Sequence, residues 1–440
     1  MIQKLKSIII ENIKNVKYGE IYFETSEGFL NTTGIYGQNG SGKTTVIDVL
    51  EMIKELIQGK KLGSKYSGLI DFEEISKVRI ETEILNESIN RYEIVFKKVN
   101  IEGKDSIEIL SETLSKKLNK KYQKFKTIIE FLSREKTISF HTLSKFELSE
   151  DALKILKSVS MENQSSFIFQ QNLLKNLNDF SRADYEKKIL DEFKSFANNL
   201  RIYTSEYGGL ISANFMAPVS IYYSEQDSTY NGIVPVPLGP QGYLSNRFIN
   251  IYKHILPQMN VLLKQIVPGI TIGYDVRDTR LGESGQDEYR VEFYSTRDGK
   301  KFSLRYESDG IKKIIALLNF LIEVYNDPNI IVAIDELDSG IFEFLLGEIV
   351  SVISTGSKGQ VIFTSHNLRV LEVLPKNKVV FSTTNPSNRY IRLKGVKTTN
   401  NLRDFYIRSL LVGGQEEELY ISKNASNIRR ALKKAGQKND

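Results

Sequence analysis

One segment restricts the fold more than any other: Gly37-Gln38-Asn39-Gly40-Ser41-Gly42-Lys43-Thr44 matches the pattern G-x-x-x-x-G-K-[ST]. It follows an apolar stretch that ends at Tyr36 and precedes a stretch from Lys43 to Gln58 in which apolar residues recur at helical spacing. A strand, a glycine-rich loop and a helix in this order form a cradle for phosphate groups, because backbone N–H groups and the helix N-terminus attract anions. The residues expected to bind the phosphates are Gly37, Asn39, Gly40, Ser41, Gly42, Lys43, Thr44 and Thr45.

A phosphate-binding loop of this kind requires a carboxylate from elsewhere in the chain to hold Mg²⁺, and a group that orients the attacking water. The apolar run 329–334 ends in Asp335 and Glu336. We expect Asp335 and the Thr44 hydroxyl to hold Mg²⁺, and Glu336 to act on the attacking water. The alternative is an ordinary strand followed by an acidic helix cap. A second apolar run, 360–364, is followed by His366, a histidine that on its own would usually be structural.

Strands alternate with helices at both ends of the chain. After residues 1–59 the pattern returns from about residue 302, with helices expected at 310–326 and 341–354 and strands at 329–334, 360–364 and 378–381. This alternation predicts an α/β fold with a parallel sheet. Residues 78–99 alternate in polarity twice and predict an antiparallel hairpin beside that sheet.

The middle of the chain reads as an insertion. We expect a mainly helical arm, with helices near 149–158 and 182–200 and a longer one over 113–134. The longer helix would present a lysine-rich face, Lys116–Lys126, as a surface for nucleic-acid phosphates or as an ordinary solvated face. The expected divisions are an N-terminal lobe of the head at 1–104, the arm at 105–260, a C-terminal lobe at 261–385 and a tail at 386–440.

Composition removes several kinds of chemistry. The chain of 440 residues has no cysteine and three histidines, which excludes thiolate metal sites and leaves oxygen ligands for any metal. The net charge of +6 does not by itself require a nucleic-acid partner. Because the first apolar run stops at Glu11 and no stretch approaches about 18 apolar residues, we expect a cytoplasmic protein with no membrane span.

The order of these motifs resembles the ABC-class ATPases of the SMC, RecF and OLD group. The resemblance rests on Asn12-Ile13-Lys14 in the first strand, the GxNGSGKT loop, a Ser-x-Gly helix start, the strand with Asp-Glu and the strand with histidine. It covers about residues 1–100 and 300–385. The chain looks particularly like compact ATPases of bacterial antiphage systems, such as the ATPase subunits of PARIS and Septu and the RloA-like proteins. The resemblance implies a P-loop head of ABC type with an antiparallel β subdomain.

The resemblance also implies roles for further residues. The segment Ser308–Gly310 stands where the ABC signature opens a helix and binds the γ-phosphate held by the opposite protomer, although Asp309 replaces the usual glycine or serine. The alternative for this segment is an ordinary N-cap. Asp338 would bridge the two sites of a dimer, and His366 would sense the γ-phosphate. Lys14 and Asn15 would line the nucleotide site, and Gln170 and Gln171 are candidates for the glutamine loop.

The function implied is ATP hydrolysis in a homodimer or higher homo-oligomer bridged by ATP. Such an assembly would sense a trigger and gate a separate, operon-encoded nuclease or toxin in antiphage defence. No Asp-x-Asp pair of a Toprim nuclease follows His366, and the missing cysteines exclude a zinc hook. Two alternatives stay open. One is a RecF-like repair ATPase that binds duplex DNA, and the other is a nucleotide-bound scaffold with negligible turnover.

Overall fold

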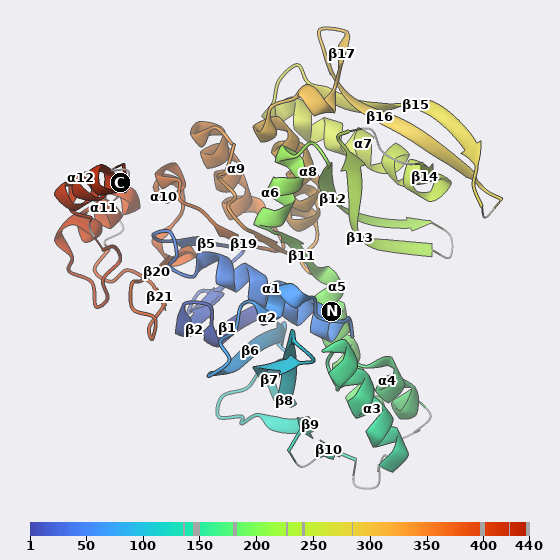
Figure 1. Cartoon of the computed structure of the whole chain (residues 1–440), viewed down its shortest axis with the longest axis vertical. Helices are drawn as coiled ribbons and strands as arrows, with labels where there is room; N and C mark the ends of the chain where they lie inside the picture. The colour runs from blue at the N-terminus through green and yellow to red at the C-terminus, as the bar shows by residue number, and fades with distance from the viewer. Residues whose placement is uncertain are drawn as a thin grey trace.

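The structure is a computed structural model that describes residues 1–134, 137–143, 150–178, 183–225, 228–239, 243–283, 285–396, 401–421 and 423–436. Figure 1 shows a sheet at the centre of the molecule, with a second sheet and a helical branch below it. Helices and long hairpins form a further lobe above it, and the C-terminal helices lie at one side.

The central sheet has six strands in the order β11-β18-β19-β5-β20-β21. The first five are parallel, and β21 is antiparallel to β20. Every residue of those five strands is buried, as expected for a sheet covered on both faces. The strands expected at 329–334, 360–364 and 378–381 are confirmed to within two residues. The bounds are β5 (Thr32–Tyr36), β11 (Leu200–Tyr203), β18 (Ile331–Ile334), β19 (Gln360–Thr364), β20 (Val379–Ser382) and β21 (Tyr390–Ile391).

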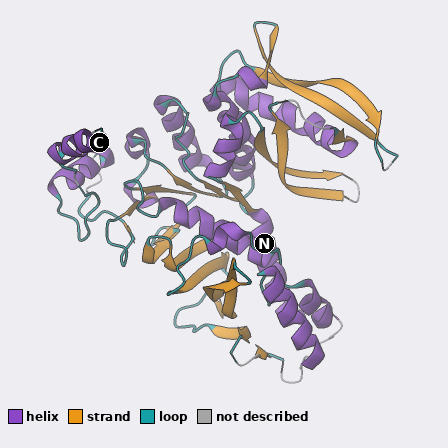
Figure 2. Cartoon of the chain, in the orientation of Figure 1, coloured by secondary structure: helices purple, strands orange, loops and turns teal. Residues whose placement is uncertain are grey.

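Helices cover both faces of the central sheet (Figure 2). On one face, Ile331 and Ala333 of β18 share a core with α1 (Lys43–Ile57) and α5 (Asp184–Asn199). On the other, Val332 and Ile334 share a core with two helices that were also expected from the sequence. These are α8 (Asp309–Asn326) and α9 (Glu343–Gly356). The alternation along β18 therefore fixes which helix lies on which face.

The second sheet is antiparallel, in the order β10-β9-β8-β7-β6-β1-β2. The predicted hairpin at 78–99 is confirmed as part of β6 and β7. The α/β head with an antiparallel subdomain is thus the fold that the sequence predicted. The bounds are β1 (Gln3–Ile13), β2 (Val16–Tyr22), β6 (Ile75–Ile84), β7 (Ser88–Ile101), β8 (Lys104–Leu118), β9 (Lys126–Leu132) and β10 (Thr137–Phe140).

The prediction of a helix over 113–134 is wrong, because this segment forms the end of β8, a turn and β9. The register from Ser88↔Leu118 to Ile101↔Lys104 pairs β8 with β7 along its whole length. This long-range pairing outweighs the helix propensity of a lysine- and leucine-rich stretch. Tyr122 lies in the turn between the two strands and is 96% exposed.

The lysine face predicted with that helix is not formed. Lys116 is buried and its ammonium group lies 2.9 Å from the Glu192 carboxylate of α5. The Lys117 ammonium lies over the ring of Phe125, 4.5 Å from its centroid. Lys116 therefore holds the antiparallel sheet to α5, and this segment does not present one basic helical stripe.

The expected arm at 105–260 is helical only in its middle part. Three helices follow the antiparallel sheet: α3 (Glu150–Asn163), α4 (Gln171–Asn178) and α5. The chain then enters the central sheet as β11, which pairs with β18. Because residues on either side of the three helices belong to the two sheets of the head, the boundaries at 105 and 260 do not separate an arm from the head.

The remaining lobe lies over the α8 face of the central sheet. A two-stranded hairpin of β12 (Met216–Glu225) and β13 (Ser228–Pro237) packs on α8. A four-stranded sheet packs with α7 (Asn246–Ile266), and its strands are β14 (Leu244–Ser245), β15 (Thr271–Leu281), β16 (Asp287–Arg297) and β17 (Lys300–Ser303). The short α6 (Ser205–Ser212) connects β11 to this lobe.

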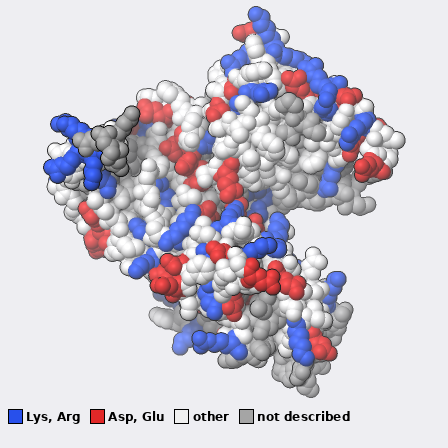
Figure 3. Space-filling model, viewed as in Figure 1, with Lys and Arg blue, Asp and Glu red and all other residues white. Residues whose placement is uncertain are grey.

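Two helices, α11 (Leu402–Val412) and α12 (Ala425–Ala435), form the C-terminal region. All residues of α12 are exposed, and its arginine and lysine side chains stand out at the edge of the molecule in Figure 3. Within the described residues, no helix is long and apolar enough to cross a membrane. The short elements are β3 (Glu24–Thr25), β4 (Gly28–Phe29), α2 (Ser64–Ser67), α10 (Leu368–Val373) and the 3₁₀ turns η1 (Leu304–Tyr306) and η2 (Lys376–Lys378).

Candidate functional site

The glycine-rich loop connects β5 directly to α1, and two of its glycines are required by its surroundings. A Cβ atom at Gly37 would lie 1.9 Å from Ser382 Oγ, and one at Gly42 would lie 2.8 Å from Val16 Cγ2. Gly42 also has a φ of +86°, in the left-handed region that favours glycine. Because Gly42 supplies no side-chain cap, the first N–H groups of α1 have no side-chain acceptor and face the loop as an anion site.

Lys43 lies across this loop. Its ammonium group donates hydrogen bonds to the carbonyl oxygens of Gly37 (3.0 Å) and Gln38 (2.9 Å). Burial lowers the pKa of Lys43 to about 8, against the attraction of Asp335, Asp338 and Glu336. A phosphate group is a better partner for this ammonium than two neutral carbonyl groups, because it is negatively charged and forms stronger, charge-assisted hydrogen bonds.

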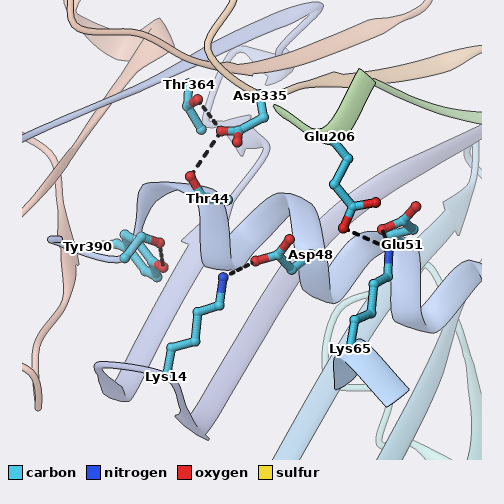
Figure 4. A network of polar contacts seen from close by, with 10 residues as sticks. Lys14, Thr44, Asp48, Glu51, Lys65, Glu206, Asp335, Thr364 and Tyr390 are labelled. Atoms are coloured by element: carbon cyan, nitrogen blue, oxygen red, sulfur yellow. Dashed lines mark hydrogen bonds and ion pairs between the residues drawn. The ribbon is translucent and has the colours of Figure 1, made fainter. Parts of the chain in front are cut away.

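The oxygen ligands expected for a metal lie together at the edge of the central sheet (Figure 4). Asp335 follows β18, is 1% exposed, and accepts hydrogen bonds at Oδ1 from Thr364 (2.6 Å) and Thr44 (3.1 Å). Its second oxygen, Oδ2, is buried and has no hydrogen-bond partner among the described residues. A buried carboxylate oxygen without a partner beside a threonine hydroxyl fits a Mg²⁺ ion, which prefers hard oxygen ligands.

Glu336 has a constrained backbone. Its φ is +49°, which is unusual for a residue other than glycine. Its N–H donates to Thr364 Oγ1 at 2.7 Å, and its carbonyl oxygen accepts a hydrogen bond from Lys313 at 2.5 Å. Two partners from different elements therefore hold Glu336 in this conformation next to Asp335.

His366 and Asp338 meet at the same edge of the sheet. The backbone N–H of His366 donates to Asp338 Oδ2 at 3.1 Å, while Asp338 Oδ1 is buried with no partner among the described residues. Burial and the nearby Lys43 ammonium lower the pKa of the His366 imidazole, so the ring is neutral at pH 7. The glycine-rich loop, the two acids and the histidine are thus brought together as the sequence suggested.

The segment Ser308–Gly310 begins α8. Ser308 is the N-cap, and its hydroxyl accepts a hydrogen bond from the Ile311 N–H at 3.4 Å. The Asp309 carboxylate accepts a hydrogen bond from Ser212 at 2.8 Å and lies 3.5 Å from the Lys312 ammonium. These two partners restrain and offset the negative charge that departs from the usual signature.

Lys14 and Asn15 lie in the turn between β1 and β2. The Lys14 ammonium lies 2.5 Å from Asp48 Oδ2 on α1 (Figure 4), and the Asn15 amide donates to the carbonyl oxygen of Gly40. Both residues therefore hold this turn against the glycine-rich loop and α1. Lys14 reaches the neighbourhood of the loop, with its charge already paired by Asp48.

The glutamine candidates are not brought to this site. The Gln170 amide is buried and donates to the Leu156 carbonyl oxygen of α3, and Gln171 begins α4. β11 is the neighbour of β18 on the side away from β19, so the segment that follows β11 lies beside Asp335 and Glu336. A cavity of about 300 Å³ there is lined by Tyr203 and Ser205 together with Asp335, Glu336 and Lys313.

Sequence reasoning missed three residues behind the loop. The Tyr390 hydroxyl donates to the Gly42 carbonyl oxygen at 2.6 Å, and Ser382 Oγ lies 2.5 Å from Ser41 Oγ. The Arg389 guanidinium donates to the Asn15 carbonyl oxygen. All three come from β20, β21 and their connection, more than 340 positions from the loop, and no local pattern in the sequence marks them.

The fold and the glycine-rich loop between β5 and α1 are those of a P-loop nucleotide-binding domain. The chain belongs to the family described as "AAA domain, putative AbiEii toxin, Type IV TA system", whose model matches residues 32–372. No curated protein matches the chain.

Several solved structures are similar to this chain at low identity. The Smc head domain of Pyrococcus furiosus bound to the C-terminal domain of ScpA is 14% identical, with 89% of this chain and 96% of that chain covered and a TM-score of 0.42. The Smc head domain of Pyrococcus yayanosii is 13% identical, with 89% and 97% covered and a TM-score of 0.43. The recombination mediator protein RecF is 16% identical, with 83% and 93% covered and a TM-score of 0.34.

Proposed function

We propose that this chain binds ATP with Mg²⁺ at the loop 37–44 and hydrolyses it. The observation that carries the proposal is the meeting of Lys43, Thr44, Asp335, Glu336 and His366 at one edge of the central sheet. Thr44 and Asp335 would hold Mg²⁺, which supplies a positive charge that neutralises the phosphates. The buried Oδ2 of Asp335, which has no partner among the described residues, supports this assignment.

The protein's own groups would divide the remaining work. The loop N–H groups and Lys43 bind the phosphates, and the Glu336 carboxylate orients the attacking water and accepts its proton. His366 is neutral at pH 7 and can donate a ring N–H to the γ-phosphate oxygen without adding a full charge. Asp338 positions the backbone of His366 through the hydrogen bond described above.

We further propose that ATP joins two copies of the chain. Each copy would supply its loop, Asp335, Glu336 and His366 to one site and its Ser308–Gly310 segment to the other. Ser308 and Asp309 are exposed at the start of an 18-residue helix, where N–H groups and the helix dipole favour an anion. Asp338 would lie at the junction of the two sites.

The biological role that we propose is control of a separate effector, a nuclease or toxin, in cytoplasmic antiphage defence. The family description names a toxin of a toxin–antitoxin system, which favours a role in which the ATP state restrains or releases a toxic activity. The DNA-repair alternative rested on the basic helix face at 116–126. That helix is not formed and Lys116 is buried against Glu192, so the alternative no longer has a helical face to rest on, although Lys120, Lys121 and Lys124 are exposed in the turn between β8 and β9.

The test uses Glu336→Gln with Glu348→Gln as its control, because Glu348 lies exposed on α9, outside the site. We expect Glu336→Gln to lower ATP turnover on the order of 100-fold. In ATP, its mass by light scattering should rise from 50.3 kDa to that of a dimer or larger species. The control should match the wild type in both assays. A Glu336→Gln chain that stays monomeric with unchanged turnover would refute the proposal, and a wild type that binds ATP without hydrolysing it would support the scaffold instead.

A further inference from the structure

Lys313 is a buried cation that the proposed mechanism does not use. It lies in the first turn of α8, is 6% exposed, and lines the cavity beside Asp335 and Glu336. Its ammonium group donates to the carbonyl oxygens of Glu336 (2.5 Å) and Ser339 (3.0 Å). A lysine is costly to bury, so its placement against two backbone carbonyls of one loop calls for a specific role.

A second contact joins the same two segments. A Cβ atom at Gly310 would lie 2.1 Å from the carbonyl oxygen of Gly340, so the backbone at the start of α8 rests directly on the loop after β18. Gly340 has a φ of +76°, which turns its carbonyl group toward Gly310. The two segments thus touch at the Gly310–Gly340 contact and at the Lys313 ammonium, and a movement of one will displace the other.

Glu336 depends on this attachment. Its left-handed backbone conformation persists only where the surroundings hold it. Thr364 holds its N–H and Lys313 holds its carbonyl group, so the peptide groups on both sides of the side chain are fixed. Without Lys313, the carbonyl side of Glu336 would lose the ammonium partner that helps to keep this conformation.

We propose that Lys313 is a positioning residue that couples the Ser308–Gly310 turn to Glu336 of the same chain. The inference rests on the proposed function, in which that turn binds the γ-phosphate of a second copy. Binding of that phosphate would fix the start of α8, and Lys313 would carry the change to the chain's own Glu336. Each site would then hydrolyse ATP only when the opposite site is filled.

Lys4 is the matched control. Like Lys313 it is a buried lysine whose ammonium group donates to two backbone carbonyl oxygens, those of Pro328 (2.6 Å) and Lys358 (2.7 Å). These carbonyls precede β18 and β19, at the end of the sheet opposite to Asp335 and Glu336, so a general effect of removing a buried lysine will appear in both variants. Lys313→Arg retains a cation that can still reach the two carbonyl groups.

The experiment measures ATP turnover against ATP concentration, ATP affinity by equilibrium binding, and thermal stability for the wild type, Lys313→Met, Lys313→Arg and Lys4→Met. We expect Lys313→Met to lower kcat at least 10-fold, with ATP affinity within 3-fold of the wild type. The cooperative dependence on ATP should be lost in Lys313→Met and partly restored in Lys313→Arg. Lys4→Met should retain the cooperative dependence.

The outcomes separate the inference from the function on which it rests. Wild-type turnover and cooperativity in Lys313→Met would overturn the inference alone. Equal losses in Lys313→Met and Lys4→Met, following a shared fall in stability, would also overturn it, since the loss would then follow from removing any buried lysine. A wild-type chain that does not turn over ATP would overturn the proposed function and this inference with it.

Discussion

Replacing Gly310 with alanine tests whether the start of α8 and the loop after β18 act as one rigid unit. Gly310 lies inside the first turn of a helix, where alanine is normally favoured by up to about 1 kcal/mol. Here the new methyl group would stand 2.1 Å from the Gly340 carbonyl oxygen, where ordinary contact begins at 3.4 Å. The carbonyl group belongs to the backbone, and the position of a Cβ atom is fixed by the backbone, so no side-chain rotation can relieve the overlap.

The expected magnitude follows from these two opposing effects. Overpacking that forces a backbone shift costs about 1–3 kcal/mol, which exceeds the gain in helix propensity. We therefore expect a net loss of about 1–2 kcal/mol in the free energy of unfolding. A displacement of about 1 Å in the loop that carries Asp338 and Glu336 should lower ATP turnover on the order of 10- to 100-fold.

The assay compares Gly310→Ala with Gly208→Ala in thermal unfolding and ATP turnover. Gly208 lies inside α6, and a Cβ atom there would meet nothing within 4 Å, so its replacement should stabilise the chain by about 0.5–1 kcal/mol. Because Gly208 also lines the cavity beside Asp335 and Glu336, it is the control for stability only. Gly310→Ala should move both quantities downward. If Gly310→Ala gained stability as Gly208→Ala does and kept wild-type turnover, the reasoning about a rigid contact would be refuted.

Two further predictions concern the support of the site. Tyr390→Phe removes the hydroxyl that donates to the Gly42 carbonyl oxygen at 2.6 Å. We expect a loss of about 1 kcal/mol in stability and weaker ATP binding, measured by equilibrium titration. Unchanged affinity would count against a role of Tyr390 in supporting the loop. Burial lowers the pKa of Lys54 to about 8, below its ordinary value of 10.5. Between about pH 8 and pH 10.5 this lysine is therefore protonated in the unfolded chain and largely deprotonated in the folded chain. Stability then rises with pH by up to about 1.4 kcal/mol per pH unit. The stability of Lys54→Met relative to the wild type should therefore fall as pH increases from about 8 to about 10 in urea unfolding, and a difference that stays constant over this range would contradict the prediction.

The parts of the site that the sequence predicted are those with local signals. The loop 37–44 carries its chemistry in consecutive residues, and Asp335 and His366 each come after a short apolar run that is typical of a buried strand. Because parallel strands end at one edge of a sheet, the order of these runs was enough to bring Asp335, Glu336 and His366 together. No geometry beyond the strand direction was required.

The parts that could not be predicted depend on pairing between distant segments. The segment 113–132 has lysines and leucines that fit a helical period, and only its register with β7 makes it a strand. Tyr390 and Ser382 contact the loop from the opposite end of the chain, and β11 reaches β18 after a helical branch that obscures its place in the sheet. Each of these contacts is decided by long-range packing, which no window of neighbouring residues reports.

The charges of the site explain why ligand binding and backbone shape are linked here. Asp335, Glu336 and Asp338 lie within four positions, and two of them hold a buried oxygen without a partner among the described residues. Lys43 lies in the glycine-rich loop and Lys313 on α8, and burial lowers the pKa of each to about 8. Both ammonium groups lie near these acids but donate their hydrogen bonds to backbone carbonyl oxygens. By themselves, the acids and cations of the site are therefore incompletely paired, at a cost in stability. A bound triphosphate would be a partner for Lys43, and its metal ion would be a partner for Asp335. Lys313 would keep its hydrogen bond to the Glu336 carbonyl oxygen. One lysine would therefore bind the phosphates, and the other would hold the residue that activates water.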